Sequence, residues 1–127
     1  MKFADNVVVW FEIPVSDMTR AVAFYETVFA TKLKQETCQS TDFPMAVFDA
    51  PDQAVHGALI AYDGFSPSDQ GSLVYLNAGE DLSLPLSRVE QAGGKVTVQK
   101  TLISPEIGYM ALFIDSEGNR VGLHSLK

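Results

Sequence analysis

The sequence predicts an α+β fold built from two similar βαβββ modules. Three observations support this prediction: an extended segment runs directly into an amphipathic helix near the start of the chain, the same order returns later, and a polar break separates the two halves. The repeat is about 55–60 residues long. Residues 1–127 are expected to form one domain, with module one at 5–62, a connector at 63–71 and module two at 72–127. Two such modules can pair as an incompletely closed barrel, with helices outside and a cleft inside.

The first helix is the clearest element. Residues 10–29 read WFEIPVSDMTRAVAFYETVF, and a helix is expected over 18–30. Asp17 suits the N-cap position, because its carboxylate can accept a free backbone N–H of the first turn. Apolar residues recur behind it at helical spacing and predict one buried stripe, formed by Met18, Ala21, Val22, Tyr25 and Phe29.

A strand is expected just before this helix, over residues 6–13. Side chains alternate between the two faces of a strand, so Phe11 and Ile13 share one face and Trp10 and Glu12 share the other. The Phe11 face is apolar and should pack on the helix. Trp10 and Glu12 then point toward whatever lies on the opposite side of the sheet.

The remaining elements follow the same plan. Strands are expected at 32–37, 45–49 and 56–62, and the segment DGFSPSDQG at 63–71 has the composition of a connector. Module two then shows a strand at 72–77, a helix at 82–92, and strands at 95–99, 109–115 and 120–126, with a loop at 101–108. Pro85 fits that helix only in its first turn, and Gly93-Gly94 should end it. Residues 115–119, DSEGN, predict a tight hairpin turn.

Composition and charge narrow the class of protein. The chain has 46% hydrophobic and 20% charged residues and a net charge of -7, with no basic cluster. These values are typical of a globular protein and argue against a nucleic-acid partner or an anionic membrane surface. No apolar run approaches the ~20 residues of a membrane helix, and the first residues lack the features of a signal peptide. Cys38 is the only cysteine, which indicates a reducing, cytoplasmic setting and an inert thiol.

Three stretches carry a resemblance to a known family: IPVSDMTRAVAFYETVF at 13–29, LVYLNAGEDL at 73–82 with AGGKV at 92–96, and GYMALFIDSEGNRVGLHS at 108–125. Together they resemble the vicinal oxygen chelate superfamily, which contains glyoxalase I, bleomycin-resistance proteins and extradiol dioxygenases. The chain is most similar to small, single-domain, glyoxalase-related bacterial members. The resemblance implies a glyoxalase-like domain, a small-molecule ligand and a homodimer. Relatives often place a glycine where this chain has Ala30-Thr31.

The resemblance also implies four cleft-facing positions that bind a divalent metal in the metal-dependent members. By register these positions are Trp10, Ala58, Leu73 and Gly122. None of these side chains carries a metal-binding atom, so no metal cofactor is expected. A displaced zinc or nickel site formed by Glu12, His56 and His124 is the alternative.

The same register predicts what else lines the cleft: Glu12, His56, Ile60, Tyr75, Asn77, Arg120 and His124. A mostly apolar cleft with a few polar groups is typical of a small-molecule site, and Trp10 could stack on a planar ligand. The expected substrate-binding residues are Trp10, Glu12, His56, Ala58, Leu73, Tyr75, Gly122 and His124. Structural roles are the alternative: Trp10 as core, Glu12 paired with Arg120, both histidines hydrogen-bonded, and Tyr75, Tyr109, Met45 and Met110 as packing residues.

Three functions remain open at this point. The first is metal-free binding of a small aromatic or amphipathic molecule. The second is a metal-free lyase or isomerase, in which Glu12 and either His56 or His124 act as acid and base. The third is a metal-dependent lyase of the lactoylglutathione-lyase type or a related enzyme of the superfamily.

Overall fold

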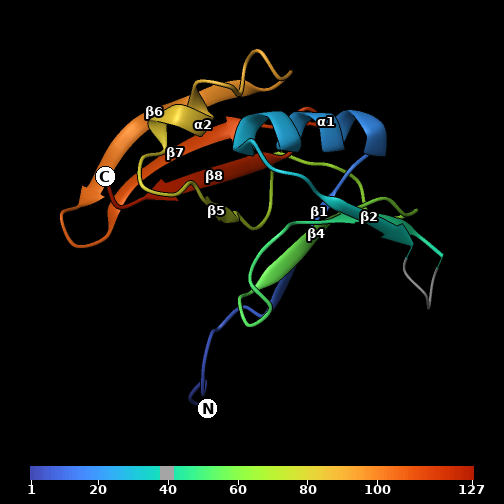
Figure 1. Ribbon diagram of the computed structural model, residues 1–127, viewed down its shortest axis with the longest axis horizontal. Coiled ribbons are helices and arrows are strands. Elements are labelled where there is room, and N and C mark those ends of the chain that lie inside the picture. The colour runs from blue at the N-terminus through green and yellow to red at the C-terminus, as the bar shows by residue number, and fades with distance from the viewer. Residues whose placement is uncertain (38–41) are drawn as a thin grey trace.

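The computed structural model describes residues 1–37 and 42–127, so Cys38 lies outside the described residues. The chain has the predicted α+β fold, in which the order βαβββ occurs twice (Figure 1). Module one contains β1 (Trp10–Pro14), α1 (Met18–Phe29), β2 (Lys34–Thr37), β3 (Pro44–Val47) and β4 (His56–Ile60). Module two contains β5 (Tyr75–Asn77), α2 (Ser83–Leu86), β6 (Lys95–Ser104), β7 (Gly108–Ile114) and β8 (Arg120–Ser125).

Each module forms one four-stranded mixed sheet. The strand orders are β1-β4-β3-β2 and β5-β8-β7-β6, so the two sheets have the same topology. In each sheet the first and last strands of the module pair in parallel, and the other neighbours are antiparallel. Among the described residues, no strand of one sheet pairs with a strand of the other, so the barrel is not closed. Figure 1 shows the sheets diverging from the region where β1 ends and β8 begins.

Helix α1 begins as predicted and contacts both sheets. The Asp17 carboxylate accepts the backbone N–H of Arg20 at 3.0 Å, which satisfies one free donor of the first turn. The buried stripe consists of Ala21, Val22, Phe24, Tyr25 and Val28. The ring of Phe24 lies 5.8 Å from that of Phe113 in β7, and the ring of Tyr25 lies 5.6 Å from that of Phe48, which follows β3. The core is therefore shared between the two modules.

Helix α2 is shorter than predicted. It covers only Ser83–Leu86, with the buried Pro85 in its single turn, whereas the sequence predicts a helix over 82–92. The N–H groups of Arg88 and Val89 bond three residues back, to Pro85 and Leu86, so the regular helical pattern tightens into turns. These turns end at Gly93, whose φ is 108°.

Three predicted strand limits differ from the structure by three residues or more, and pairing explains two of them. Strand β1 begins at Trp10 and not at residue 6, because Trp10 pairs with His56, the first residue of β4, and the preceding residues have no partner. Strand β5 begins at Tyr75 and not at residue 72, because Tyr75 is its first residue paired with β8, opposite Gly122. Strand β6 continues to Ser104 and replaces most of the predicted loop, and three register shifts accommodate its length.

Candidate functional site

One end of the space between the modules is closed by the predicted hairpin turn at residues 115–119. The Asn119 side chain donates from Nδ2 to the Pro14 carbonyl at the end of β1, at 2.8 Å. Its Oδ1 accepts the backbone N–H of Ser68 in the connector, at 3.1 Å. A single side chain therefore links both modules and the connector. We call the cluster of Tyr25, Asp115, Glu117 and Asn119, with their direct partners, the junction.

Asp115 anchors the buried part of the junction. The Tyr25 hydroxyl donates to Asp115 Oδ2 at 2.6 Å, and both residues are buried. The second carboxylate oxygen accepts the N–H groups of Glu117 and Asn119, each at 2.9 Å. Burial, and then the nearby Asp115 carboxylate, raise the pKa of Tyr25 well above its ordinary value. The hydroxyl therefore stays protonated and keeps donating this hydrogen bond.

Glu117 fastens the junction to the start of α1. Its Oε1 accepts the N–H groups of Ser16 and Asp17, each at 2.9 Å, and the Arg20 guanidinium binds both carboxylate oxygens at 2.7 and 3.0 Å. Burial raises the pKa of Glu117, but Arg20 and the backbone donors outweigh burial and lower it to about 2. The carboxylate is therefore charged at neutral pH.

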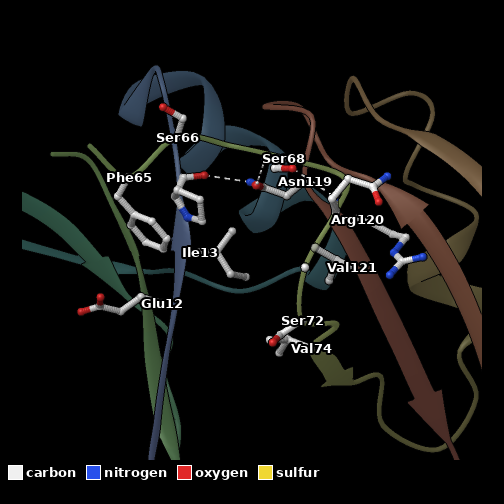
Figure 2. A pocket seen from close by; sticks show the side chains of 13 residues that line it. Glu12, Ile13, Phe65, Ser66, Ser68, Ser72, Val74, Asn119, Arg120 and Val121 are labelled. Atoms are coloured by element: carbon white, nitrogen blue, oxygen red, sulfur yellow. Dashed lines mark hydrogen bonds between the residues drawn. The ribbon is translucent and has the colours of Figure 1, made fainter. Parts of the chain in front are cut away.

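A cavity of about 370 Å³ lies beside the junction, between the two modules (Figure 2). Its wall is formed by three segments: β1, the connector with the residues that follow it, and the start of β8. The lining residues are Glu12, Ile13, Pro14, Phe65, Ser66, Ser68, Gln70, Gly71, Ser72, Val74, Asn119, Arg120 and Val121. This volume is in the range that holds a small organic molecule.

The cavity combines apolar and polar surfaces. Ile13, Val74 and Val121 supply apolar side chains, and the connector supplies serine hydroxyls and Gln70. Glu12 and Arg120 lie on opposite sides of the cavity (Figure 2). Both residues are described by the structure and form no ion pair with each other; Glu12 Oε2 instead accepts the Trp10 indole N–H at 3.2 Å. The predicted Glu12–Arg120 ion pair is therefore wrong.

The predicted site residues of module one share one face of its sheet. Trp10 pairs with His56, and Glu12 pairs with Ala58. The Trp10 side chain is 41% exposed, which contradicts its alternative interpretation as core, whereas Ala58 is completely buried. The two ring nitrogens of His56 lie 2.8 and 3.0 Å from the carbonyl oxygens of Ala54 and Ala50, so they hold the loop before β4.

The predicted site residues of module two also share a face. Tyr75 pairs with Gly122, and Asn77 pairs with His124. A Cβ atom on Gly122 would lie 2.5 Å from the Tyr75 ring, so this ring fills the space above the glycine. His124 Nε2 lies 2.6 Å from the Ile107 carbonyl. Leu73 precedes β5 and is partly buried.

The alternative metal site is not assembled. Within residues 1–37 and 42–127, no three His, Cys, Asp or Glu side chains come together in a way that could hold a metal ion. Glu12, His56 and His124 are all among these residues. Their expected catalytic roles stay predictions.

The sequence interpretation missed the contribution of the connector and of Asn119 to the cavity. Ser66 and Ser68 were assigned to the connector, since serine and glycine are common in loops, and Ser72 to the start of a strand. A usable signal was present in the sequence: four hydroxyl or amide side chains occur within seven residues, at 66–72.

Comparison with known proteins supports the fold assignment. A family model described as bleomycin resistance protein-like N-terminal matches residues 8–34. TnmS3, an antibiotic binding protein from Streptomyces sp. CB03234, is 25% identical, with a TM-score of 0.61 and 98% of each chain covered. The chain has the fold of the vicinal oxygen chelate superfamily. No curated protein matches the sequence.

Two further solved members of this superfamily show the breadth of the fold. A glyoxalase/bleomycin resistance protein from Albidiferax ferrireducens T118 gives a TM-score of 0.70 at 13% identity, with 93% of this chain and 97% of that chain covered. A mutant glyoxalase I from Zea mays gives 0.65 at 19% identity, with 92% of this chain covered. The chain spans only 45% of the maize protein. In the part of the chain that the structure describes, no helix has the length and apolar character needed to cross a membrane.

Proposed function

We propose that the chain binds a small organic molecule in the cleft between its two modules, without the metal ion that other members of its superfamily use. The observation that carries this proposal is the cavity of about 370 Å³ lined by both modules and by the connector. The antibiotic-binding description of TnmS3, the most identical of the structures compared above, supports a binding role. The residue types at Trp10, Ala58, Leu73 and Gly122 support the metal-free part, since none of them can donate to a metal.

Trp10 gives the cleft a surface for a flat ligand. Its indole N–H is bound to Glu12, which lines the cavity, and the ring itself is exposed. An aromatic ring held by a hydrogen bond at one edge loses little conformational freedom when a planar molecule stacks on it. The Tyr75 ring, 46% exposed on the equivalent face of module two, provides a second aromatic surface.

Trp10 is also the only tryptophan in the chain, which makes the test direct. A compound library is screened by thermal shift, and each stabilising compound is titrated against the intrinsic fluorescence of Trp10. We expect compounds that raise the melting temperature and change this fluorescence with the same saturation curve. The control is Leu84→Ala, which removes an exposed apolar side chain from α2, outside the cavity lining, and should leave both responses unchanged. A library without any compound that meets both criteria would contradict the proposal.

A separate measurement tests whether ligand binding requires a metal ion. Protein purified without chelator is analysed for nickel, zinc, iron and manganese, and ligand binding is compared before and after dialysis against EDTA. We expect less than stoichiometric metal and equal affinity. Stoichiometric metal together with loss of binding after dialysis would instead favour the metal-dependent lyase.

A metal-free lyase or isomerase is the second candidate, and the position of Glu12 favours it. Glu12 lines the cavity and receives one side-chain hydrogen bond, so a carboxylate oxygen is available to take a proton from a bound ligand. If any cleft ligand is turned over, Glu12→Gln should abolish turnover and leave binding nearly intact. Unchanged turnover would exclude Glu12 as the base.

We further propose a homodimer in the cytoplasm, in line with the family resemblance and with the single cysteine. Light scattering on the eluate of a sizing column measures the mass directly. A mass near the 13.9 kDa of one chain would exclude the dimer. Fractionation of expressing cells tests the compartment.

A further inference from the structure

The cleft contains one cation whose charge is not used by the fold. Arg20 is bound to Glu117, Lys100 lies 2.9 Å from Asp81, and Arg88 donates to the carbonyl of Val28. Within the described residues, Arg120 takes part in no ion pair and no side-chain hydrogen bond, although the chain has a net charge of -7. Arg120 is also the only Lys or Arg among the described residues that line the cavity. A guanidinium in this position is available to an external partner.

Strand geometry places Arg120 on the cleft side. It pairs with Ile114 of β7 and lies two residues before Gly122, so it shares the face that carries Tyr75 and His124. Asn119, its neighbour in sequence, is buried and fixed by the junction, which holds the start of β8 in place. The backbone that carries Arg120 is therefore preorganised.

The cavity has a positively charged residue on one side and a negatively charged residue on the other. Arg120 lies on the β8 side of the cavity and Glu12 on the β1 side, and their side chains point in opposite directions in Figure 2. The apolar side chains of Ile13, Val74 and Val121 complete the lining between the strands. A guanidinium binds a carboxylate or a similar oxyanion through two parallel hydrogen bonds. A second anionic group on the β1 side would be repelled by Glu12.

We propose that the ligand of this cleft is a small organic anion whose acidic group binds Arg120, while its other end is neutral or positively charged and faces Glu12. This inference rests on the proposed binding function and specifies its ligand class. The apolar body of the ligand would lie on Ile13, Val74 and Val121. The serine hydroxyls of the connector would bind its polar substituents.

Benzoate and benzamide test the inference, because they have nearly the same shape and differ in charge. Each is titrated at millimolar concentration into isotopically labelled protein, and amide shifts are followed by NMR, since ligands of this size bind weakly. We expect benzoate to shift the amides of Ile13, Val74 and Val121 and to bind at least ~10-fold more tightly than benzamide. Benzoate binding should also weaken as salt is added.

Four variants make the test specific. Arg120→Gln should reduce benzoate affinity at least ~10-fold, to the level of benzamide, and leave benzamide unchanged. Arg120→Lys keeps the charge without the planar fork and should retain part of the affinity. Lys95→Gln makes the same change in net charge at an exposed residue at the start of β6, outside the cavity lining, and should have no effect. Glu12→Gln should increase benzoate affinity, because it removes the opposing carboxylate.

The outcomes separate this inference from the proposed function. Equal affinity of both probes, an Arg120→Gln variant that still binds benzoate normally, or benzoate without any effect on the cleft amides would each overturn the anion inference. None of these results removes the cleft as a binding site, because neutral compounds from the library could still meet the fluorescence criterion. Only the failure of the library screen contradicts the proposed function itself.

Discussion

The two ends of the space between the modules are built in opposite ways. At the junction, buried polar groups are satisfied by one another: Asn119 binds Pro14 and Ser68, and Asp115 receives the Tyr25 hydroxyl. Away from the junction the sheets diverge (Figure 1). There, Trp10 and Tyr75 present large aromatic rings to solvent. One end has nearly all its polar atoms paired, and the other leaves apolar surface uncovered.

This difference indicates that the junction stabilises the fold, whereas the open end is available to bind a ligand. Buried hydrogen-bonded networks specify one arrangement of the backbone, because each unpaired member would lose free energy. Exposed aromatic surface contributes little to folding and is available to a ligand. The cavity adjoins the junction, since Asn119 belongs to the junction and also lines the cavity. Substitutions at the two ends should therefore differ in what they change.

Among substitutions at the two ends, the largest loss of stability is expected for Asn119→Ala. The variant leaves the Pro14 carbonyl and the Ser68 N–H without their partner and removes one donor to Asp115. Unpaired buried polar groups lose about 1–3 kcal/mol each, so the free energy of unfolding should fall by about 3–4 kcal/mol. Urea denaturation followed by circular dichroism measures it.

The matched control is Asn77→Ala at the open end. Asn77 is exposed, and its Oδ1 accepts only the N–H of Gly79, at 2.9 Å, so the loss should be below about 1 kcal/mol. Equal losses for the two asparagines would contradict the contrast between the ends.

The second prediction concerns the acid stability that Glu117 confers. Its pKa lies at about 2 in the folded protein, below the ordinary value of 4.5, so the folded state binds this proton less readily than the unfolded state. The contribution of Glu117 to the free energy of unfolding is therefore fully present above pH 4.5 and is lost as the pH falls toward 2. The shift from 4.5 to about 2 corresponds to about 3 kcal/mol, and the Glu117 side chain is fully shielded from solvent.

Glu117→Gln should remove this part of the pH dependence. Asp81, whose pKa is lowered to about 2 chiefly by the backbone N–H of Ser83 and by Lys100, titrates in the same window. The free energy of unfolding of wild type and variant is therefore measured by denaturation at several pH values from 7 to 2. The difference between the two proteins at each pH reports on Glu117 alone, because Asp81 titrates in both. Parallel curves for the two proteins would show that Glu117 does not fasten the junction.

The sequence predicted the parts of this structure that depend on local chemistry. Asp17 as the N-cap, Pro85 in the first turn of α2 and the tight turn at residues 115–119 all follow from nearby residues, and all are confirmed. The βαβββ repeat is also confirmed, because hydrophobic periodicity survives across a whole module.

Features that depend on distant partners could not be predicted in the same way. The start of β1 is set by where β4 begins, and nothing in VVVW at residues 7–10 reveals this limit. The Tyr75 ring above Gly122 depends on the register of two strands far apart in the chain. The connector becomes a cavity wall only because Asn119 holds Ser68 from a position 51 residues away. A pattern confined to one segment contains none of this information.

A smaller effect, of opposite sign, is expected at the far end of α1. The helix starts at the junction but ends at Ala30, which adopts the left-handed conformation with φ 51° and ψ 49°. This conformation is strained for a residue with a Cβ atom and is free of strain for glycine. Ala30→Gly should therefore raise the free energy of unfolding by about 0.5–1 kcal/mol and the melting temperature by about 2–4 °C.

Ala23→Gly provides the control for this substitution. Ala23 is exposed in the interior of the same helix, where glycine should lower stability by about 1 kcal/mol. Differential scanning calorimetry of both variants gives the comparison. A loss of stability in both would mean that the left-handed end of α1 is not strained.

The smallest effect on stability is expected at the open end itself. Trp10 and Tyr75 are 41% and 46% exposed, so truncating either side chain removes surface that is already partly in water. Trp10→Ala should change the free energy of unfolding by less than about 1 kcal/mol, whereas Phe24→Ala, a truncation in the core, should lower it by about 3–5 kcal/mol. Trp10→Ala should nevertheless abolish the binding of planar cleft ligands in the thermal-shift assay. A Trp10 variant that unfolds as readily as the Phe24 variant would mean that the indole stabilises the fold, and the separation between a folding end and a binding end would then be wrong.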